Sequence, residues 1–106
     1  MPFSAERGEV WQVDFGLAAK VRPALILSHP PSDAARALVT VVYHTTAVRN
    51  SPHEVLLRVR GLEDGAFDAQ NIYTVPLAKL IRHRATLTQS QLAEVERAVR
   101  EWLGLR

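Results

Sequence analysis

The sequence predicts a mainly β fold in which about five short strands are followed by one C-terminal helix. Two observations lead to this prediction. Short runs rich in Val, Ile, Leu and Thr, each bounded by Gly or Pro, recur over the first three quarters of the 106-residue chain. The last segment instead repeats its apolar residues at helical spacing. Such a helix would pack its apolar face on a small, curved sheet.

The five expected strands are separated by residues that break a strand ladder. Gly16 ends the first run, Pro30 and Pro31 lie in the loop after the second, Pro52 precedes the fourth, and Pro76 ends the fifth. Residues 61–65 are expected to form a loop that bears a turn, and residues 77–81 a single helical turn. The expected strands cover residues 9–15, 21–28, 38–45, 54–59 and 69–75.

The C-terminal helix has the clearest signals for its start and its end. Thr88 and Gln91 have the spacing of a capping box, and Leu87 and Leu92 have the spacing of a hydrophobic staple across that cap. Gly104 is expected to end the helix. We expect Trp102 to belong to the apolar face, which consists of Leu92, Val95, Ala98, Val99, Trp102 and Leu103.

The composition limits the class of protein. Hydrophobic residues make up 47% of the chain, enough for the core of one domain over residues 1–106. No apolar stretch reaches the ~18 residues of a membrane helix, and the first residues lack a secretory pattern, so the expected location is the cytoplasm. The absence of cysteine excludes disulfides and thiolate chemistry. The net charge of +2 is compatible with only a local anion-binding face.

A pairing of two strands brings together a cation and a hydroxyl. If runs 21–28 and 38–45 form an antiparallel hairpin around loop 29–37, the numbers of paired residues sum to about 67. Leu25 then faces Val42, and Arg22 faces Thr45. A guanidinium and a hydroxyl at one end of a sheet form a geometry suited to holding a phosphate.

Four segments in order resemble the motifs of MazF/PemK toxins. Each motif is weak alone, but their order and the terminal helix are fairly specific to this family. The resemblance covers nearly the whole chain, from Arg7 to about Leu103. The segments are residues 7–11 (RGEVW), 22–28 (RPALILS), 41–46 (VVYHTT) and 71–75 (NIYTV), the last followed by Leu80.

The resemblance implies a fold, an activity and partners. Members of the family are SH3-like small barrels related to Kid and CcdB, they form homodimers, and they are toxins of type II toxin–antitoxin systems. Most are metal-independent endoribonucleases that cut single-stranded RNA, such as mRNA, at short sequences and need no cofactor. Attack by the RNA 2′-hydroxyl leaves a 2′,3′-cyclic phosphate and a 5′-hydroxyl. A cognate MazE-like antitoxin blocks the RNA groove with an acidic C-terminal segment.

The family's catalytic Arg and Thr correspond to Arg22 and Thr45, and Thr46 stands at the family's usual Ser. Arg22 is expected to stabilise charge on the phosphate rather than to accept a proton, because its pKa exceeds ~12. Thr45 can donate a hydrogen bond to the same phosphate. His44 is a candidate general acid or base, although strand alternation points it to the face opposite Thr45.

Further residues are candidates for RNA binding, and none forms an expected metal site. Two features depart from the family pattern: Tyr43 replaces the Pro that precedes the catalytic Thr region, and the loop at 16–21 is short. No pair of histidines has convincing helical ligand spacing. Lys20, Arg49 and Arg82 could follow the RNA backbone, Tyr43 and Tyr73 could stack on bases, and Thr46 and Asn71 complete the candidates.

Two alternatives to the ribonuclease remain open at this stage. The chain could be a CcdB-like toxin that binds a protein target without catalysis, or an SH3-like binding module that has lost activity. The pair Arg22 and Thr45 favours the ribonuclease, because a protein poison does not need it. For the antitoxin, we expect apolar anchors around Trp11, Leu17 and Tyr73.

Overall fold

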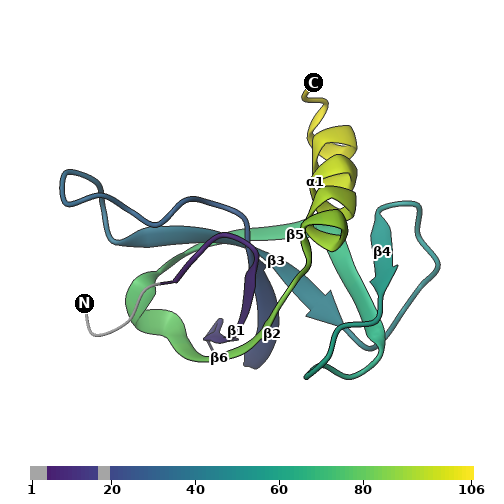
Figure 1. Ribbon diagram of the computed structural model, residues 1–106, viewed down its shortest axis with the longest axis horizontal. Helices are drawn as coiled ribbons and strands as arrows, with labels where there is room; N and C mark the ends of the chain where they lie inside the picture. The colour runs from purple at the N-terminus through teal and green to yellow at the C-terminus, as the bar shows by residue number, and fades with distance from the viewer. Residues whose placement is uncertain (1–4, 17–19) are drawn as a thin grey trace.

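A computed structural model describes residues 5–16 and 20–106 (Figure 1). It confirms a mainly β fold with a C-terminal helix, but the antiparallel sheet has six strands rather than about five. Their order is β4-β5-β3-β2-β1-β6, so β4 and β6 form the two edges and the sheet is not closed into a complete barrel. The elements are β1 (Glu9–Asp14), β2 (Val21–Ile26), β3 (Leu38–Thr45), β4 (Glu54–Leu57), β5 (Gly65–Pro76), η1 (Leu77–Lys79), β6 (Leu80–Thr86) and α1 (Gln89–Leu103).

Two predicted elements were wrong in part. The helical turn expected over 77–81 ends at Lys79, and the chain then continues as β6, which pairs with β1. The loop expected at 61–65 ends earlier, because β5 already begins at Gly65 and places Asp68 inside a strand. Glycine is needed there, since a Cβ at Gly65 would collide with the backbone oxygen of Thr45.

The curved sheet separates two apolar clusters. One face carries a cluster that includes Val13, Ala24 and Val41, and the other face carries a cluster that includes Leu25 and Val42 and is covered by α1. Adjacent residues of β2 and β3 alternate between the two clusters, as strand geometry requires. In Figure 1, α1 stands over β5 beside β4. Each residue of β3 therefore belongs to a defined face.

The predicted register of the central hairpin is confirmed. Leu25 is paired with Val42, and Ile26 with Val41, so the paired numbers sum to 67 as expected. Continuing this register along both strands aligns Arg22 with Thr45. Both lie on the face opposite α1, because each is an odd number of residues away from Leu25 or Val42.

A bulge in β5 changes the sheet beside this hairpin. Val42 pairs with Ile72, but the next residue of β3, Tyr43, pairs with Asp68. Residues 69–71 of β5 therefore have no counterpart in β3. A bulge of this kind bends the strand and redirects its side chains. It brings Asp68 and Asn71 to the end of the sheet where Arg22 and Thr45 lie.

The ends of α1 follow the prediction, but one apolar residue does not. Thr88 and Gln91 form the capping box, and Gly104 ends the helix in the left-handed conformation (φ 72°). Trp102, expected on the apolar face as a core or interface residue, is 43% exposed and so is not part of the core; its ring lies 5.1 Å from that of His53. Within the described residues, no helix is long and apolar enough to cross a membrane.

The first family-like motif, RGEVW, has a structural role. Arg7 forms an ion pair with Glu96 of α1 and donates a hydrogen bond of 3.1 Å to the Leu27 carbonyl. Gly8 has a positive φ of 95° and joins two strands, since its N–H donates to Ile26 and its carbonyl accepts from Leu87. The motif therefore fastens β1 to β2, β6 and the helix.

Candidate active site

A hollow of about 440 Å³ lies where the ends of β2, β3 and β5 meet. We call it the Arg22–Thr45 hollow, after the two predicted catalytic residues in its wall. It is also lined by Tyr43, Ala47, Arg49, Glu54, Asp68 and Asn71. Of the predicted RNA-binding residues, the structure thus brings Tyr43, Arg49 and Asn71 to the same site. These residues come from separate strands and loops, and Arg22 and Asn71 are 49 positions apart in the sequence.

Contacts on each side orient the two predicted catalytic residues. The Arg22 guanidinium carbon lies over the Tyr43 ring, 5.5 Å from its centre, an arrangement typical of a cation–π interaction. The Thr45 hydroxyl oxygen accepts a 3.0 Å hydrogen bond from the Ala47 N–H. Its own hydrogen therefore stays available for donation into the hollow. A planar cation and a hydroxyl donor on one face could together bind a phosphate.

The carboxylates of the hollow already accept hydrogen bonds. Glu54 accepts from the backbone N–H groups of Arg49 and Ser51 at 3.0–3.1 Å, which fixes the turn between them. Asp68 accepts from the Gln70 N–H at 3.0 Å and from the Asn71 side chain at 2.6 Å. Asp68 precedes the strand expected over residues 69–75, and sequence reasoning did not place it in the site.

An aromatic cluster adjoins the hollow and extends its surface. The rings of Phe15, Tyr43 and Tyr73 lie 5.0–5.5 Å from one another. The Tyr73 hydroxyl donates to the Asn71 side chain at 3.2 Å. Tyr73 is 38% exposed, so its ring is accessible for stacking. Phe15, which sequence reasoning missed, completes a cluster that could receive unpaired bases.

Three other candidate residues lie elsewhere. Lys20 is exposed in the β1–β2 turn, where its backbone bonds to Phe15 and Gly16, and it does not line the Arg22–Thr45 hollow. Trp11 was expected to anchor an antitoxin, but it is only 6% exposed and stacks on His83. Leu17, the other expected anchor, lies outside the described residues.

His44 and Thr46 point to a second hollow on the other face of β3. This His44 hollow has a volume of about 210 Å³ and is also lined by Gln12, Arg22, Glu63 and Arg84. Arg22 thus lies between the two hollows. The His44 ring is only 3% exposed and packs edge-on against Phe67, with ring centres 4.9 Å apart. Sequence reasoning missed Gln12, Glu63 and Arg84, which come from three separate segments.

The charge state of His44 follows from its surroundings. Burial lowers the pKa of His44 below its ordinary value of 6.5, and the positive charge of Arg84 lowers it further. Glu63 acts in the opposite direction but more weakly. The imidazole is therefore neutral at pH 7. Its Nε2 atom is buried and has no hydrogen-bond partner among the described residues.

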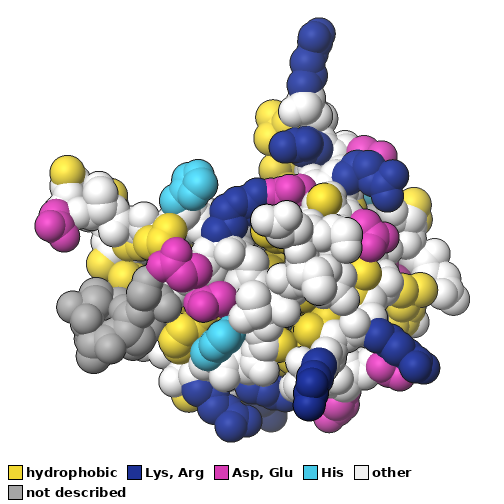
Figure 2. Space-filling view, viewed as in Figure 1, with side chains coloured by type: hydrophobic (Ala, Val, Ile, Leu, Met, Phe, Trp, Pro, Cys, Tyr) yellow, Lys and Arg dark blue, Asp and Glu magenta, His cyan; other side chains and the backbone are white. Residues whose placement is uncertain are grey.

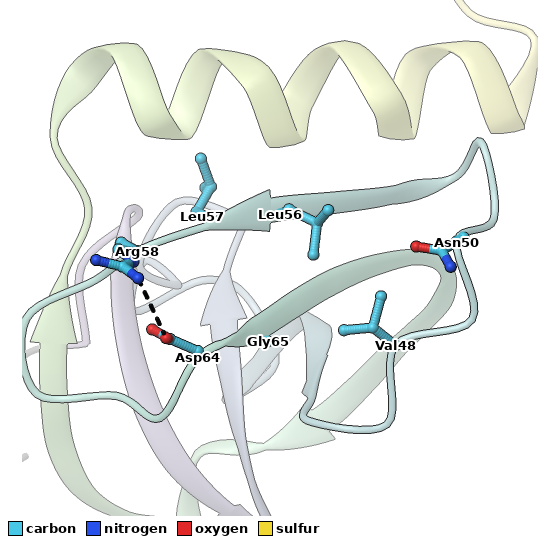
Figure 3. Close-up of a pocket in the computed structure, with 7 residues that line it drawn as sticks. All are labelled: Val48, Asn50, Leu56, Leu57, Arg58, Asp64 and Gly65. Carbon is cyan, nitrogen blue, oxygen red and sulfur yellow. Dashed lines mark ion pairs between the residues drawn. The ribbon is translucent and has the colours of Figure 1, made fainter.

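A third hollow, of about 370 Å³, contains none of the predicted site residues (Figure 3). In Figure 3 the side chains of Val48 and Leu56 point into it beside the edge strand β4. Arg58 and Asp64 form an exposed ion pair of 3.8 Å at its rim. Over the described part of the chain, no three His, Asp or Glu side chains gather as a metal site would require.

A family model of PemK-like, MazF-like toxins of type II toxin–antitoxin systems matches residues 6–103. The chain belongs to this family. The matched residues include Arg22 and Thr45, the lining of the Arg22–Thr45 hollow and of the His44 hollow, and the C-terminal helix. The resemblance of the four sequence motifs is therefore confirmed.

Solved structures of the family share the fold. An endoribonuclease from a mycobacterial species, in complex with its cognate antitoxin, is 27% identical, with 96% of this chain and 97% of that chain covered and a TM-score of 0.83. Mycobacterium tuberculosis toxin MazF-mt6 is 28% identical over 92% and 98% of the chains, with a TM-score of 0.79. MazE–MazF from Deinococcus radiodurans, at 22% identity, 98% and 99% coverage and a TM-score of 0.82, supports the fold alone. None of the curated proteins compared with the chain matches it.

The lowered pKa of His44 predicts a loss of stability in acid. Below pH 6.5 the His44 of the unfolded chain takes up a proton that the buried, neutral ring resists, so the free energy of unfolding falls until the pH reaches the folded-state pKa. Urea unfolding of the wild type and of His44→Gln at pH 7.5 and 5.0 should show a smaller pH dependence in the variant. His29→Gln, in an exposed loop, is the control. An equal pH dependence in wild type and His44→Gln would contradict the assignment.

Proposed function

We propose that this toxin is a sequence-specific endoribonuclease that cuts single-stranded RNA in the Arg22–Thr45 hollow. The observation that carries the proposal is the shared face: Arg22 and Thr45 line one hollow although 23 positions separate them in sequence. The related mycobacterial endoribonuclease and its complex with a cognate antitoxin support the same activity and partner for this chain. A cytoplasmic location and a single toxin domain over residues 1–106 agree with this role.

The residues of the hollow supply transition-state stabilisation. Arg22 would hold the scissile phosphate through two N–H groups and keep the 2′-hydroxyl in line with the bond that breaks. Thr45 would donate its hydroxyl hydrogen to an oxygen that gains charge as the phosphorane forms. In cyclisation the 2′-hydroxyl would lose its proton to water as the 2′-oxygen bonds to phosphorus, and the P–O5′ bond would break as water protonates the 5′-oxygen. His44 lies on the other face of β3, so a role for it as acid or base would require transfer past the strand end.

The position of the aromatic cluster suits the RNA on either side of the cut. Phe15, Tyr43 and Tyr73 form one cluster beside the proposed phosphate site, and Arg49 also lines the Arg22–Thr45 hollow. Bases could stack on the exposed Tyr73 ring while Arg49 neutralises a neighbouring phosphate. A non-catalytic, CcdB-like action on a protein target has no specific support in this arrangement.

Alanine substitutions of the two proposed catalytic residues should impair RNA cleavage in different ways. Arg22→Ala removes a charge and a bidentate donor, so we expect both weaker RNA binding and a loss of about 10³-fold in kcat/KM. Thr45→Ala removes one hydrogen bond made mainly in the transition state, so kcat should fall about 10²-fold with little change in KM. Single-turnover cleavage of a long RNA, with ends mapped, measures both.

Matched variants control this experiment. Thr45→Ser retains the hydroxyl and should keep most of the rate, and Arg36→Ala removes an equal charge from the exposed 29–37 loop without effect. EDTA should leave cleavage intact, because the family resemblance implies a metal-independent reaction and Glu54 and Asp68 already accept N–H donors. Wild-type cleavage by both alanine variants would remove the basis for this site.

The antitoxin should compete with RNA for the same hollow. An acidic tail can place a carboxylate where RNA places a phosphate, so Arg22→Ala should weaken both ligands. With Trp11 buried, the accessible apolar anchor is the Phe15–Tyr43–Tyr73 cluster, and Tyr73→Ala should weaken the tail further. Displacement of a labelled 2′-deoxy RNA by a cognate antitoxin tail measures this competition. A ternary complex that contains both ligands would refute the shared hollow.

We also infer a homodimer. Large apolar side chains remain exposed in one copy, among them Val21, Leu56, Ile81 and Leu103. A two-fold pair would cover part of this surface and join two grooves. Sedimentation equilibrium at micromolar concentration should give twice the chain mass of 11.8 kDa. A single species at the monomer mass would count against the dimer.

A further inference from the structure

We propose that the His44 hollow binds one unpaired base beside the cut, and that Glu63 and His44 select an amino-bearing base, cytosine or adenine, over uracil. The proposal rests on the ribonuclease function proposed above. It adds a second site to the phosphate site, on the other face of β3, with its own ligand. Four observations support it: an unpartnered polar group, position, size and the mixture of donors and acceptors.

The first observation is the buried nitrogen of His44. The side chain is 97% buried and lines the hollow, yet its Nε2 atom has no hydrogen-bond partner among the described residues. Leaving a buried polar atom without a partner is costly, and such groups are uncommon in folded proteins. The ring packs closely over Gly65, where a Cβ would lie 3.0 Å from the ring carbon Cε1, so glycine is what allows the ring to lie there. Because the His44 side chain lines the hollow, a ligand bound in the hollow could supply the missing partner.

The second observation is the position of Arg22, which lines both hollows. A phosphate held by Arg22 in one hollow has its adjoining nucleotides within reach of the other. Proteins that read single-stranded RNA turn bases out of the stack and contact their Watson–Crick edges. The base next to the cut is therefore the part of the substrate nearest to the His44 hollow.

The third observation is size. The hollow encloses about 210 Å³, below the ~300–1,000 Å³ of pockets that hold drug-sized molecules. A hollow of this volume can hold a single base but not a complete nucleotide with its phosphates. The carboxylate of Glu63 also lines the hollow and offsets one of the two positive charges that Arg22 and Arg84 bring to it.

The fourth observation is the mixture of hydrogen-bonding groups. Glu63 can only accept, and so it favours an exocyclic amino group over the O4 carbonyl of uracil. The neutral ring of His44 can donate to the ring nitrogen that lies beside the amino group in cytosine and adenine. Thr46 can serve either role. Together these groups match the donor–acceptor order of an amino-bearing base.

Arg84 acts as a positioning residue. Its two terminal nitrogens donate to Gln12 at 2.5 Å and to the Gly61 carbonyl at 3.1 Å. These bonds tie β6, β1 and the loop before β5 together around the hollow. Burial is the main cause of the lowered pKa of His44, and the positive charge that these bonds hold beside the ring lowers it further.

The test uses the complete protein and an RNA library with random bases at the positions flanking the cut. The wild type should prefer cytosine or adenine over uracil at one of the two flanking positions. Glu63→Gln, which can donate to a carbonyl, should reduce that preference about tenfold at this position alone. His44→Phe should reduce it by a similar factor. Glu94→Gln, an identical change on the exposed surface of α1, should leave the preference unchanged.

The outcomes separate this inference from the proposed function. If the wild type cuts RNA without a preference at either flanking position, or if Glu63→Gln keeps the wild-type preference, the base site is overturned and the ribonuclease stands. If the wild type cuts no RNA, the proposed function fails, and the base site fails with it. Glu63 is exposed, so the test does not depend on whether His44→Phe folds.

Discussion

The antiparallel register between β2 and β3 is the constraint on which both hollows depend. Leu25 opposite Val42 sets which residues of each strand face α1, and so places Arg22 and Thr45 together on the other face. A slip of one residue would exchange the faces of every side chain on a strand. It would bury Thr45 against Phe67 and expose His44. Two apolar clusters, one on each side of the sheet, oppose such a slip because both would be broken at once. In Figure 2 the basic side chains are spread over the visible face and interspersed with acidic ones, in keeping with a net charge of only +2.

The bulge in β5 supplies a wall of the Arg22–Thr45 hollow that the β2–β3 hairpin alone does not form. Three residues without counterparts in β3 carry Asn71 over the end of the sheet, where its side chain links Asp68 to Tyr73. The close approach of Gly65 to the Thr45 backbone ties the start of the same strand to the end of β3. Together these contacts place one wall of the Arg22–Thr45 hollow on a strand rather than on a loop, so its geometry is held by ladder hydrogen bonds. Sites held in this way lose less entropy when a substrate is ordered.

The sequence was sufficient for the parts of the fold that depend on local chemistry. The capping box at Thr88, the stop at Gly104 and the register of one hairpin all follow from residues close to one another or from a single turn.

The sequence was insufficient for the elements whose structure is determined by tertiary contacts. β6 contains Arg82, His83 and Arg84 in succession, which hides its alternation, and two irregularities in its pairing with β1 break the period. From the sequence, Gly65 was expected in a turn, but in the structure it lies in β5 and allows the backbones of β5 and Thr45 to approach closely. Trp102 fits the apolar stripe of α1, yet the sheet ends before reaching it. Gln12, Glu63 and Arg84 meet only through pairing of distant segments.

The two faces of β3 divide the chemistry between consecutive residues. Thr45 lines the hollow proposed for the phosphate and His44 lines the hollow proposed for the base, while Arg22 lines both. Because neighbouring strand residues share one peptide unit, a backbone shift that improves the fit of a base at His44 would also move Thr45. With both proposed sites occupied, such a shift would couple recognition of the flanking base to stabilisation of the reacting phosphate. A wrong base that entered the His44 hollow only partly would displace Thr45 from the phosphate, and a displacement of ~1 Å at such a site can cost about 10²-fold in rate. The sequence preference of this toxin would then be expressed in kcat as well as in affinity.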